Sequence, residues 1–157
     1  VSDIYKKYIK HKKFHEKDFE KESEVFERED HIDWKYFIYY YKDKPIAFTE
    51  LKVFDSNHVL TGQFGWDYEN PKLGMGTYAT LYEIDWSIKN KCKKYYLSFG
   101  YEKTSMYKSR FDGFEFWNGR GWIDNKSLYK KLCEYDTDIE SLSDLNKYQR
   151  KYFEVIK

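Results

Sequence analysis

The 157-residue sequence lacks the features that mark several common protein classes. Its two cysteines, Cys92 and Cys133, lie far apart and form no CxxC pair, which excludes a disulfide framework and favours a reducing compartment. No apolar run approaches the roughly 20 residues that cross a bilayer, so no membrane span is expected. Residues 1–30 are charged throughout and show no signal-peptide pattern. We therefore expect a cytoplasmic protein without membrane contact.

An excess of charge of one sign is also missing. The 28 basic and 27 acidic side chains give a net charge of +1, which argues against a strongly basic nucleic-acid binder. A local basic patch is present at residues 88–110, where Glu102 is the one acid among several Lys and Arg side chains. This patch would attract the phosphates of a donor, and lysines that complement a helix C-terminus explain it equally well.

The motifs of several enzyme classes are absent too. The four histidines, His11, His15, His31 and His58, lack the spacing of a metal site. No Ser-His-Asp elbow and no P-loop lysine motif occurs. We predict no metal and no tightly bound cofactor.

Aromatic side chains are what the sequence has in abundance. It contains 17 Tyr, 12 Phe and 5 Trp. An aromatic surface would stack nucleic-acid bases, whereas AT-rich codon usage explains the same composition without any function. In either case these rings must build much of the core.

The hydrophobic pattern of the first half predicts helices followed by an antiparallel meander. Apolar residues at helical spacing in residues 1–30 indicate two helices, broken near His11–His15. Runs rich in aromatic and β-branched residues then predict strands over 34–42, 46–54 and 58–66. Gly62 and Gly65 inside the third strand indicate a bulge or a close backbone approach.

The second half predicts a loop, a long helix and shorter elements. The expected elements are a loop over 67–74, a helix over about 75–91, a strand over 93–99, a short helix over 104–111, a strand over 114–123 broken at Asn118-Gly119, and polar helices from about Lys126. The buried stripe of the long helix should be Tyr78, Leu81, Tyr82, Asp85 or Trp86, and Ile88.

This order predicts an α+β fold. A mixed, mostly antiparallel sheet would be flanked by helices, with two splayed parallel strands at its centre. The arrangement resembles the GNAT domain of acyl-CoA N-acyltransferases. We expect one such domain over residues 1–125 and a helical extension over 126–157 packed on it.

A glycine loop between the third strand and the long helix is the main candidate binding site. Its sequence, Asn70–Thr77, places Gly74 and Gly76 at the predicted start of the helix. Unpaired amides and the helix dipole bind anionic oxygen there, and glycines let a phosphate approach closely. Pro71 stands where the coenzyme A loop of acetyltransferases has Gln or Arg, and a tight turn that starts a structural helix explains the glycines as well.

Five segments of the sequence, in order, resemble arginyl-tRNA–protein transferases and their bacterial leucyl-transferring relatives. The run Leu73–Trp86 (LGMGTYATLYEIDW) is similar to the family's "LGTY…EIEW" signature. The other four segments are Ile4–Tyr8 (IYKKY), Lys44–Ala47 (KPIA), Lys94–Tyr101 (KYYLSFGY) and Met106–Phe111 (MYKSRF). Met75 is an extra residue within the glycine turn, which makes this loop look more like a coenzyme A loop.

The resemblance implies an aminoacyltransferase. Such a protein moves an amino acid from aminoacyl-tRNA to an amine, either a protein N-terminus or a small molecule, and holds the tRNA 3′ end where acetyltransferases hold coenzyme A. An acetyl-CoA-dependent N-acetyltransferase, favoured by Gly74-Met75-Gly76, and a non-catalytic binding module remain as alternatives. The donor is thus aminoacyl-tRNA or acetyl-CoA, and the oligomeric state stays open.

Candidate catalytic residues follow from the same comparison. Tyr107 resembles the general acid of many GNAT enzymes, and a packed aromatic is the competing interpretation. Glu83, which aligns with the first glutamate of the signature, and Glu50 are candidate bases, with an ordinary ion-paired carboxylate as the alternative. The predicted donor-binding residues are Phe64, Gly65, Leu73, Gly74, Met75, Gly76, Thr77, Tyr78, Lys108 and Arg110.

Overall fold

The computed structural model describes residues 1–12, 33–98, 100–135 and 138–155. They form two compact units, Val1–Ser98 and Phe99–Lys157, each with its own buried apolar residues. The boundary between the units falls inside the range 1–125 that was expected to form one domain.

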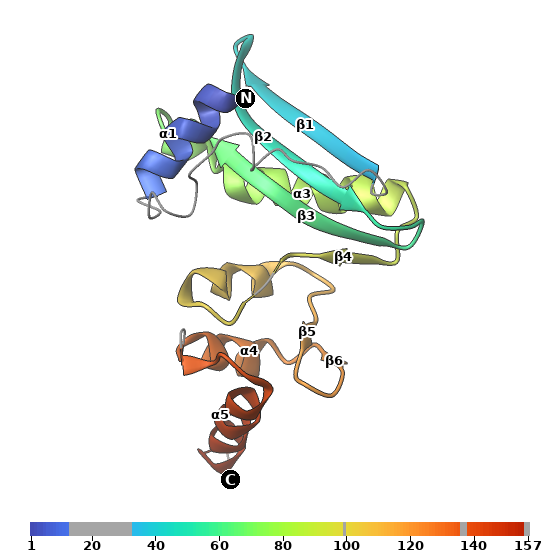
Figure 1. The fold of residues 1–157 in the computed structure, drawn as a ribbon, viewed down its shortest axis with the longest axis vertical. Helices are drawn as coiled ribbons and strands as arrows, with labels where there is room; N and C mark the ends of the chain where they lie inside the picture. The colour runs from blue at the N-terminus through green and yellow to red at the C-terminus, as the bar shows by residue number, and fades with distance from the viewer. Residues whose placement is uncertain (13–32, 99, 136–137, 156–157) are drawn as a thin grey trace. The chain divides into compact units, whose positions relative to one another are not determined.

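The first unit is built on a four-stranded sheet, as the meander prediction requires. Strands β1 (Asp33–Tyr41), β2 (Lys44–Val53) and β3 (His58–Trp66) pair antiparallel in chain order, and β4 (Lys94–Tyr96) pairs parallel with β3 (Figure 1). The two residues that join β1 to β2, Lys42 and Asp43, both have positive φ, as a two-residue hairpin turn demands. The three antiparallel strands and the α+β class are confirmed.

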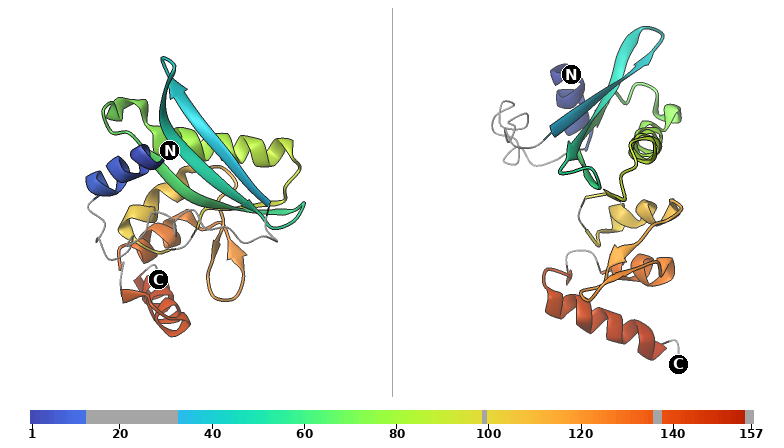
Figure 2. Two further views of the ribbon diagram at one scale, coloured as in Figure 1. Left: turned by 45° about the horizontal axis from the view of Figure 1, so that its top comes forward. Right: turned by 90° about the vertical axis from the view of Figure 1, so that its right-hand side faces the viewer.

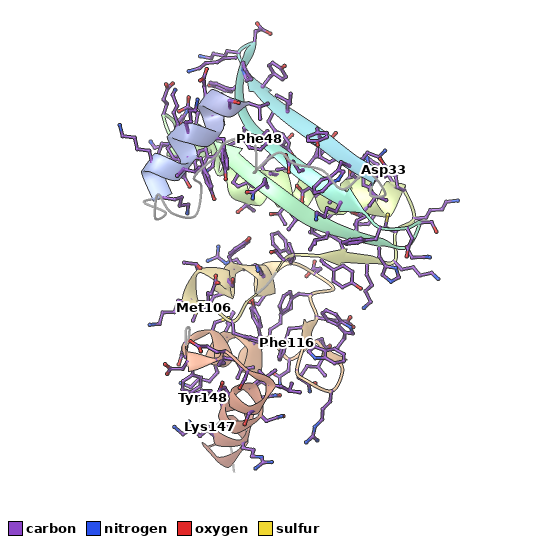
Figure 3. All side chains as sticks on the ribbon, in the orientation of Figure 1. Asp33, Phe48, Met106, Phe116, Lys147 and Tyr148 are labelled. Atoms are coloured by element: carbon purple, nitrogen blue, oxygen red, sulfur yellow. The ribbon has the colours of Figure 1, made fainter. Side chains whose placement is uncertain are left out.

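A helix covers each face of this sheet because successive side chains of a strand alternate between faces. Phe48 of β2 packs against Ile4 and Tyr5 of α1 (Ser2–Lys12) on one face (Figure 3). The neighbouring Ala47 belongs to the cluster under α3 on the other face. Figure 2 shows the two helices on opposite sides of the sheet. The second helix predicted within residues 1–30 lies outside the described residues.

The long helix α3 (Met75–Lys89) confirms the predicted element, but the prediction of its buried face is wrong. Four members of the predicted stripe, Tyr78, Leu81, Tyr82 and Ile88, are 42–68 % exposed, Asp85 is exposed and Trp86 is half-buried. The buried residues are instead Met75, Ala79, Thr80, Glu83 and Ser87. Mostly small side chains therefore face the sheet, while the large aromatic ones lie on the flank of the helix.

Local hydrogen bonds explain how polar residues occupy this buried face. The Thr80 hydroxyl donates to the Gly76 carbonyl at 2.9 Å, and the Ser87 hydroxyl donates to the Glu83 carbonyl at 2.7 Å. A hydroxyl that is satisfied by its own helix leaves no unpaired group in the interface. A prediction from hydrophobicity alone does not include these hydroxyl hydrogen bonds. It therefore placed the large apolar residues, and not Thr80 and Ser87, on the buried face.

The glycines of β3 permit two close approaches, as predicted. The register of β2 and β3 shifts between Thr49 and Leu51, opposite Gly62. A Cβ atom on Gly62 would lie 3.0 Å from the Cβ of Glu50, and one on Gly65 would lie 2.7 Å from the ring of Phe48. Both predictions for β3, the bulge and the close backbone approach, are confirmed.

The parallel pair opens after three residues. His58, Val59 and Leu60 pair with Lys94, Tyr95 and Tyr96. Beyond Leu60 strand β3 continues to Trp66, whereas β4 ends at Tyr96, so the strand predicted over 93–99 is shorter than expected. Within the described residues this leaves an open seam beside the second half of β3, which is the splayed arrangement expected of a GNAT-like fold.

The second unit is mostly helical. Its elements are η3 (Lys103–Arg110), β5 (Phe116–Trp117), β6 (Trp122–Ile123), α4 (Lys126–Cys133) and α5 (Leu142–Val155). The Asn125 side chain caps α4 by accepting from the Leu128 amide, and the ring of Tyr129 packs on Phe114 and Phe116 (Figure 3). The strand predicted over 114–123 is only a short hairpin of two residues on each side.

We expect the Gly65→Ala variant to be less stable, because its new methyl group would overlap the ring of the fully buried Phe48. Overpacking of this kind costs about 1–3 kcal/mol, measured as the free energy of unfolding in urea. The control is Gly121→Ala, where an added Cβ meets no atom within 4 Å. Equal stability of the two variants would contradict the close packing of β3 on β2.

Candidate functional site

The loop before α3 forms a tight turn that leads directly into the first turn of the helix. A short turn, η2 (Pro71–Leu73), ends at Gly74, whose φ of 58° and ψ of 36° are left-handed. Such a conformation favours glycine, which explains Gly74 at this position. No side chain among the described residues caps the N-terminus of α3. The Thr77 and Tyr78 amides point back to the Gly74 carbonyl, at 3.0 and 3.1 Å.

In the part of the chain that the structure describes, the amides of Met75 and Gly76 are therefore the unpaired donors of the first turn, since they precede the first helical hydrogen bond. A Cβ on Gly74 would meet no described atom within 4 Å, and one on Gly76 would meet only the Phe64 ring, at 3.8 Å. A side chain would therefore have room at either glycine. Uncapped amides and the helix dipole at such a helix start suit an anionic oxygen.

The predicted donor-binding residues of the first unit lie around this helix start. The Phe64 ring of β3 is next to Gly76 and meets Tyr8 of α1 edge to face, with ring centroids 5.7 Å apart. Leu73 packs on the core, and the Met75 side chain is buried in it, so Met75 offers a ligand only its backbone. Tyr78 is 55 % exposed on the flank of α3.

An ion-pair network fixes the end of β3 that leads into this loop. Asp67 is nearly buried and accepts a hydrogen bond from the Lys7 ammonium at 2.8 Å. Lys7 and Lys44 also bind Glu69. Burial raises the pKa of Asp67, but its bonds to Lys7 and the Glu69 amide outweigh that effect and hold the pKa below its ordinary value. No local sequence pattern predicts this network, because its members come from α1, β2 and the loop after β3.

The two candidate bases, Glu83 and Glu50, are both buried, each with 1 % of its surface exposed. Glu83 faces the sheet from α3. Glu50 follows Thr49 on β2 and lies on the α1 side, near Tyr5; burial, with a smaller contribution from Glu50, raises the pKa of Tyr5 to about 12. The sheet thus separates the two carboxylates. Neither is open to a bound amine, so a role as base would require a chain of water molecules.

Glu83 joins α3 to the middle residue of β4, Tyr95, which pairs with Val59 of β3. The Tyr95 hydroxyl of β4 donates to Oε2 of Glu83, while Oε1 has no hydrogen-bond partner among the described residues. Burial raises the pKa of Glu83, and bonds from Tyr95, Thr49 and Thr61 only partly offset this. Sequence reasoning singled out Glu83 but missed Tyr95, because nothing along the chain links residues 83 and 95.

The other predicted site residues lie together on η3 in the second unit. Tyr107 is 39 % exposed and meets Phe111 edge to face. Lys108 is buried, which lowers its pKa, while the charge of Glu102 opposes that shift. Of the two predicted anion-binding side chains, only Arg110 is exposed. These three residues therefore lie on one element of the second unit, whereas the glycine loop belongs to the first unit.

No metal site or membrane helix emerges from the part of the chain that the structure describes. No three His, Cys, Asp or Glu side chains gather there. Two of the histidines have other contacts: the His11 ring stacks on Tyr68, and His58 binds Asp55. None of the described helices is long and apolar enough to cross a bilayer.

Fold and loop thus define an α+β domain of the GNAT-like kind, with an uncapped helix start among the described residues and a short parallel pair of strands. A model of one protein family, "Arginine-tRNA-protein transferase, C terminus", matches residues 1–118. The chain belongs to this family. No curated protein and no solved structure matches the chain significantly.

We expect the Glu83→Gln variant to change how stability depends on pH. The pKa of Glu83 is raised in the folded protein, so the folded state keeps a proton that the unfolded state releases above the ordinary value of 4.5. The stabilisation is complete below the unfolded pKa and is lost as pH rises towards the folded pKa. Glutamine cannot ionise, so the unfolding free energy of the variant should fall less with rising pH.

Urea denaturation from about pH 4 to about pH 8 measures this difference. The slope of the unfolding free energy against pH is proportional to the difference in bound protons between the unfolded and folded states. Carboxylates with lowered pKa values, such as Asp67, contribute the opposite slope equally to both proteins and cancel in the comparison. Parallel profiles of the two proteins would show that Glu83 holds no proton in the folded state.

Proposed function

We propose that this chain moves an aminoacyl group from aminoacyl-tRNA to an amine, either the N-terminus of a protein or a small-molecule amine. The observation that carries the proposal is the family match over residues 1–118 together with the open amides of Met75 and Gly76. The family name supports a tRNA-linked donor. The geometry of the loop supports a contact with an anionic oxygen of that donor, such as a phosphate of the tRNA 3′ end.

The chemistry is the aminolysis of an ester. The uncharged amine attacks the carbonyl carbon of the aminoacyl ester, a C–N bond forms, and the C–O bond to the terminal ribose breaks. The amine loses a proton and the ribose oxygen gains one. Positioning supplies much of the rate, because well-oriented reactants gain up to about 7–11 kcal/mol. The protein must therefore hold the donor ester still and admit the amine beside it.

We assign the donor to the part of β3 that extends beyond the end of β4. The backbone of β3 near Phe64 and Gly65 continues beyond the last parallel pair, Leu60 with Tyr96. An extended donor end would add to this edge by strand-like hydrogen bonds. The adjacent amides of Met75 and Gly76 would hold its phosphate. Leu73, Gly74, Thr77 and Tyr78 shape this binding site.

Tyr107 is the proposed general acid for the leaving ribose oxygen. A phenol can donate a proton as the C–O bond breaks, and its ring is part-exposed on η3. The exposed Arg110 and the buried Lys108 of the same element are proposed as contacts of the tRNA backbone.

The direct test is a transfer assay with labelled arginyl-tRNA and a set of peptides that differ in their first residue. We expect label to move to peptide with arginyl-tRNA and no transfer from acetyl-CoA to the same peptides. Leucyl-tRNA in parallel reports the selectivity for the amino acid. Transfer from acetyl-CoA alone would replace this proposal by N-acetylation, and absence of transfer from every donor would leave a binding module.

The Gly76→Ala variant separates ligand binding from folding. Its methyl group would make an ordinary 3.8 Å contact with Phe64, and alanine is favoured over glycine in a helix by up to about 1 kcal/mol. The fold should therefore be as stable or more stable. The same methyl group occupies the space in front of the amides, so we expect a rise in the KM for the donor. An unchanged KM would exclude a close contact between the donor and Gly76.

The Tyr107→Phe variant tests the general acid. Loss of the hydroxyl should lower kcat at least about tenfold, within the range that general acid catalysis contributes, with little change in the KM for the donor. Circular dichroism controls for folding. A kcat equal to that of the unchanged protein would remove Tyr107 from the mechanism.

A further inference from the structure

A stack of nearly parallel aromatic rings lies at the end of α1, next to the loop that follows β3 (Figure 1). The His11 ring lies on the Tyr68 ring, with centroids 3.6 Å apart and an interplanar angle of 15°. Tyr68 also stacks with Tyr8, at 6.0 Å and 17°. His11 is exposed although Tyr68 covers one of its faces. The stack therefore ends in an aromatic ring that a ligand can reach.

This stack adjoins the proposed donor site. Tyr8 meets Phe64 edge to face, with centroids 5.7 Å apart. A Cβ added to Gly76, at the start of α3, would lie 3.8 Å from the Phe64 ring. These contacts connect the ring of His11, through Tyr68 and Tyr8, with the amides to which we assign a phosphate of the donor. A donor strand that leaves the helix start on this side would meet the stack next.

Positive charge flanks the stack. Lys10 and Lys12 lie on either side of His11 in the last turn of α1, and both are exposed. The Lys12 ammonium is 6.0 Å from the centre of the Tyr68 ring, within the range of a cation–π contact. Lysines at a helix C-terminus complement the helix dipole. The dipole does not account for an imidazole that lies flat on Tyr68.

The acidic groups next to the stack are already neutralised. Among the described residues, Lys7 binds Asp67 and Glu69, and Lys44 binds the same two carboxylates. Two ammonium groups thus balance two carboxylates. The two lysines in the last turn of α1 take no part in this network, so the described surface around His11 is basic in sum.

We propose that this α1 surface, made of Lys10, His11, Lys12 and Tyr68, binds the unpaired 3′ nucleotides of the donor tRNA. One base stacks on the exposed face of His11, and the two lysines contact the phosphates on either side of it. Proteins bind single strands in this way, with aromatic rings under the bases and cations along the backbone. The inference rests on the proposed function, because the aminoacyl-tRNA donor supplies the single strand.

The chemistry of the α1 surface favours unpaired nucleotides over other anions. An RNA duplex offers phosphates and 2′-hydroxyls, but its bases stack on one another and would leave the His11 ring unused. An acidic peptide offers carboxylates to the lysines without a flat ring for the imidazole. Unpaired nucleotides provide both a flat ring and an adjacent anion.

Fluorescence anisotropy tests the stacking contact. The probe is a labelled RNA hairpin that copies a tRNA acceptor stem with its unpaired 3′ nucleotides and carries no amino acid. We expect His11→Ala to weaken its binding at least about fivefold, as the loss of one base–aromatic stack does. His11→Phe keeps a flat ring and should bind like the unchanged protein. Circular dichroism of both variants controls for folding of α1.

A salt titration with the same probe tests the two lysines. Each phosphate contact of a single strand contributes about 0.7 to the slope of log affinity against log salt concentration, so the double variant Lys10→Gln, Lys12→Gln should lose about 1.4 from this slope. The control double variant is Lys147→Gln, Lys151→Gln. It removes the same charge from two exposed positions of α5 in the second unit and should keep the slope.

Two competitors test the nature of the ligand. A blunt hairpin of the same stem should bind more weakly than the probe and should be indifferent to His11→Ala. Polyglutamate with the same number of charges should compete far less than unlabelled probe. The proposal would be overturned by equal binding of the blunt hairpin, by equal competition from polyglutamate, by normal binding of His11→Ala, or by an unchanged slope in the Lys10 and Lys12 double variant.

The binding measurement is independent of transfer, because the probe carries no aminoacyl group. A protein that transfers an amino acid, but whose His11 and Lys10–Lys12 variants bind the probe normally, would refute the α1 surface alone. A protein that binds the probe as predicted, but transfers nothing from any donor, would refute the proposed reaction and leave the RNA contact in place.

Discussion

Close packing of α3 against the sheet is the constraint on which the candidate site depends. Small side chains at Ala79, Thr80 and Ser87 let the helix lie against β2 and β3, and two of them satisfy their own hydroxyls within the helix. This packing fixes where the helix starts. Gly74 then reverses the chain in a left-handed conformation and leaves the next two amides without a capping side chain among the described residues. A helix packed by bulky residues would lie farther from the sheet, and its N-terminus would no longer stand next to Phe64.

The same packing accounts for the unusual placement of charge and aromatic surface. Glu83 is carried into the interface and becomes a buried acid bound to Tyr95, whose strand is the short partner of the parallel pair. Glu83 is thus better suited to holding β4 on α3 than to acting as an exposed base. Tyr78 and Tyr82, which were predicted on the buried face, lie instead on the flank of α3 and line a groove together with residues of β1.

Much of the architecture was predictable from sequence, because it depends on local signals. Runs of aromatic and β-branched residues predicted β1 to β3, glycines predicted the irregularity and close contacts of β3, and the loop glycines predicted the start of α3. The buried face of α3 was not predictable from hydrophobicity, since the hydroxyls of Thr80 and Ser87 are satisfied by bonds to their own helix. The Glu83–Tyr95 pair and the Lys7–Asp67 network were also beyond sequence reasoning, since each joins side chains that meet only after the sheet has formed.

The central claim is that the first amides of α3 contact the anionic end of the donor. Amide resonances of the protein, followed by NMR during titration with a non-hydrolysable analogue of the aminoacylated tRNA 3′ end, test it directly. The account predicts the largest and saturable shifts at Met75 and Gly76, with smaller shifts at Phe64 and Gly65. Saturable binding that leaves the Met75 and Gly76 amides unshifted would contradict it.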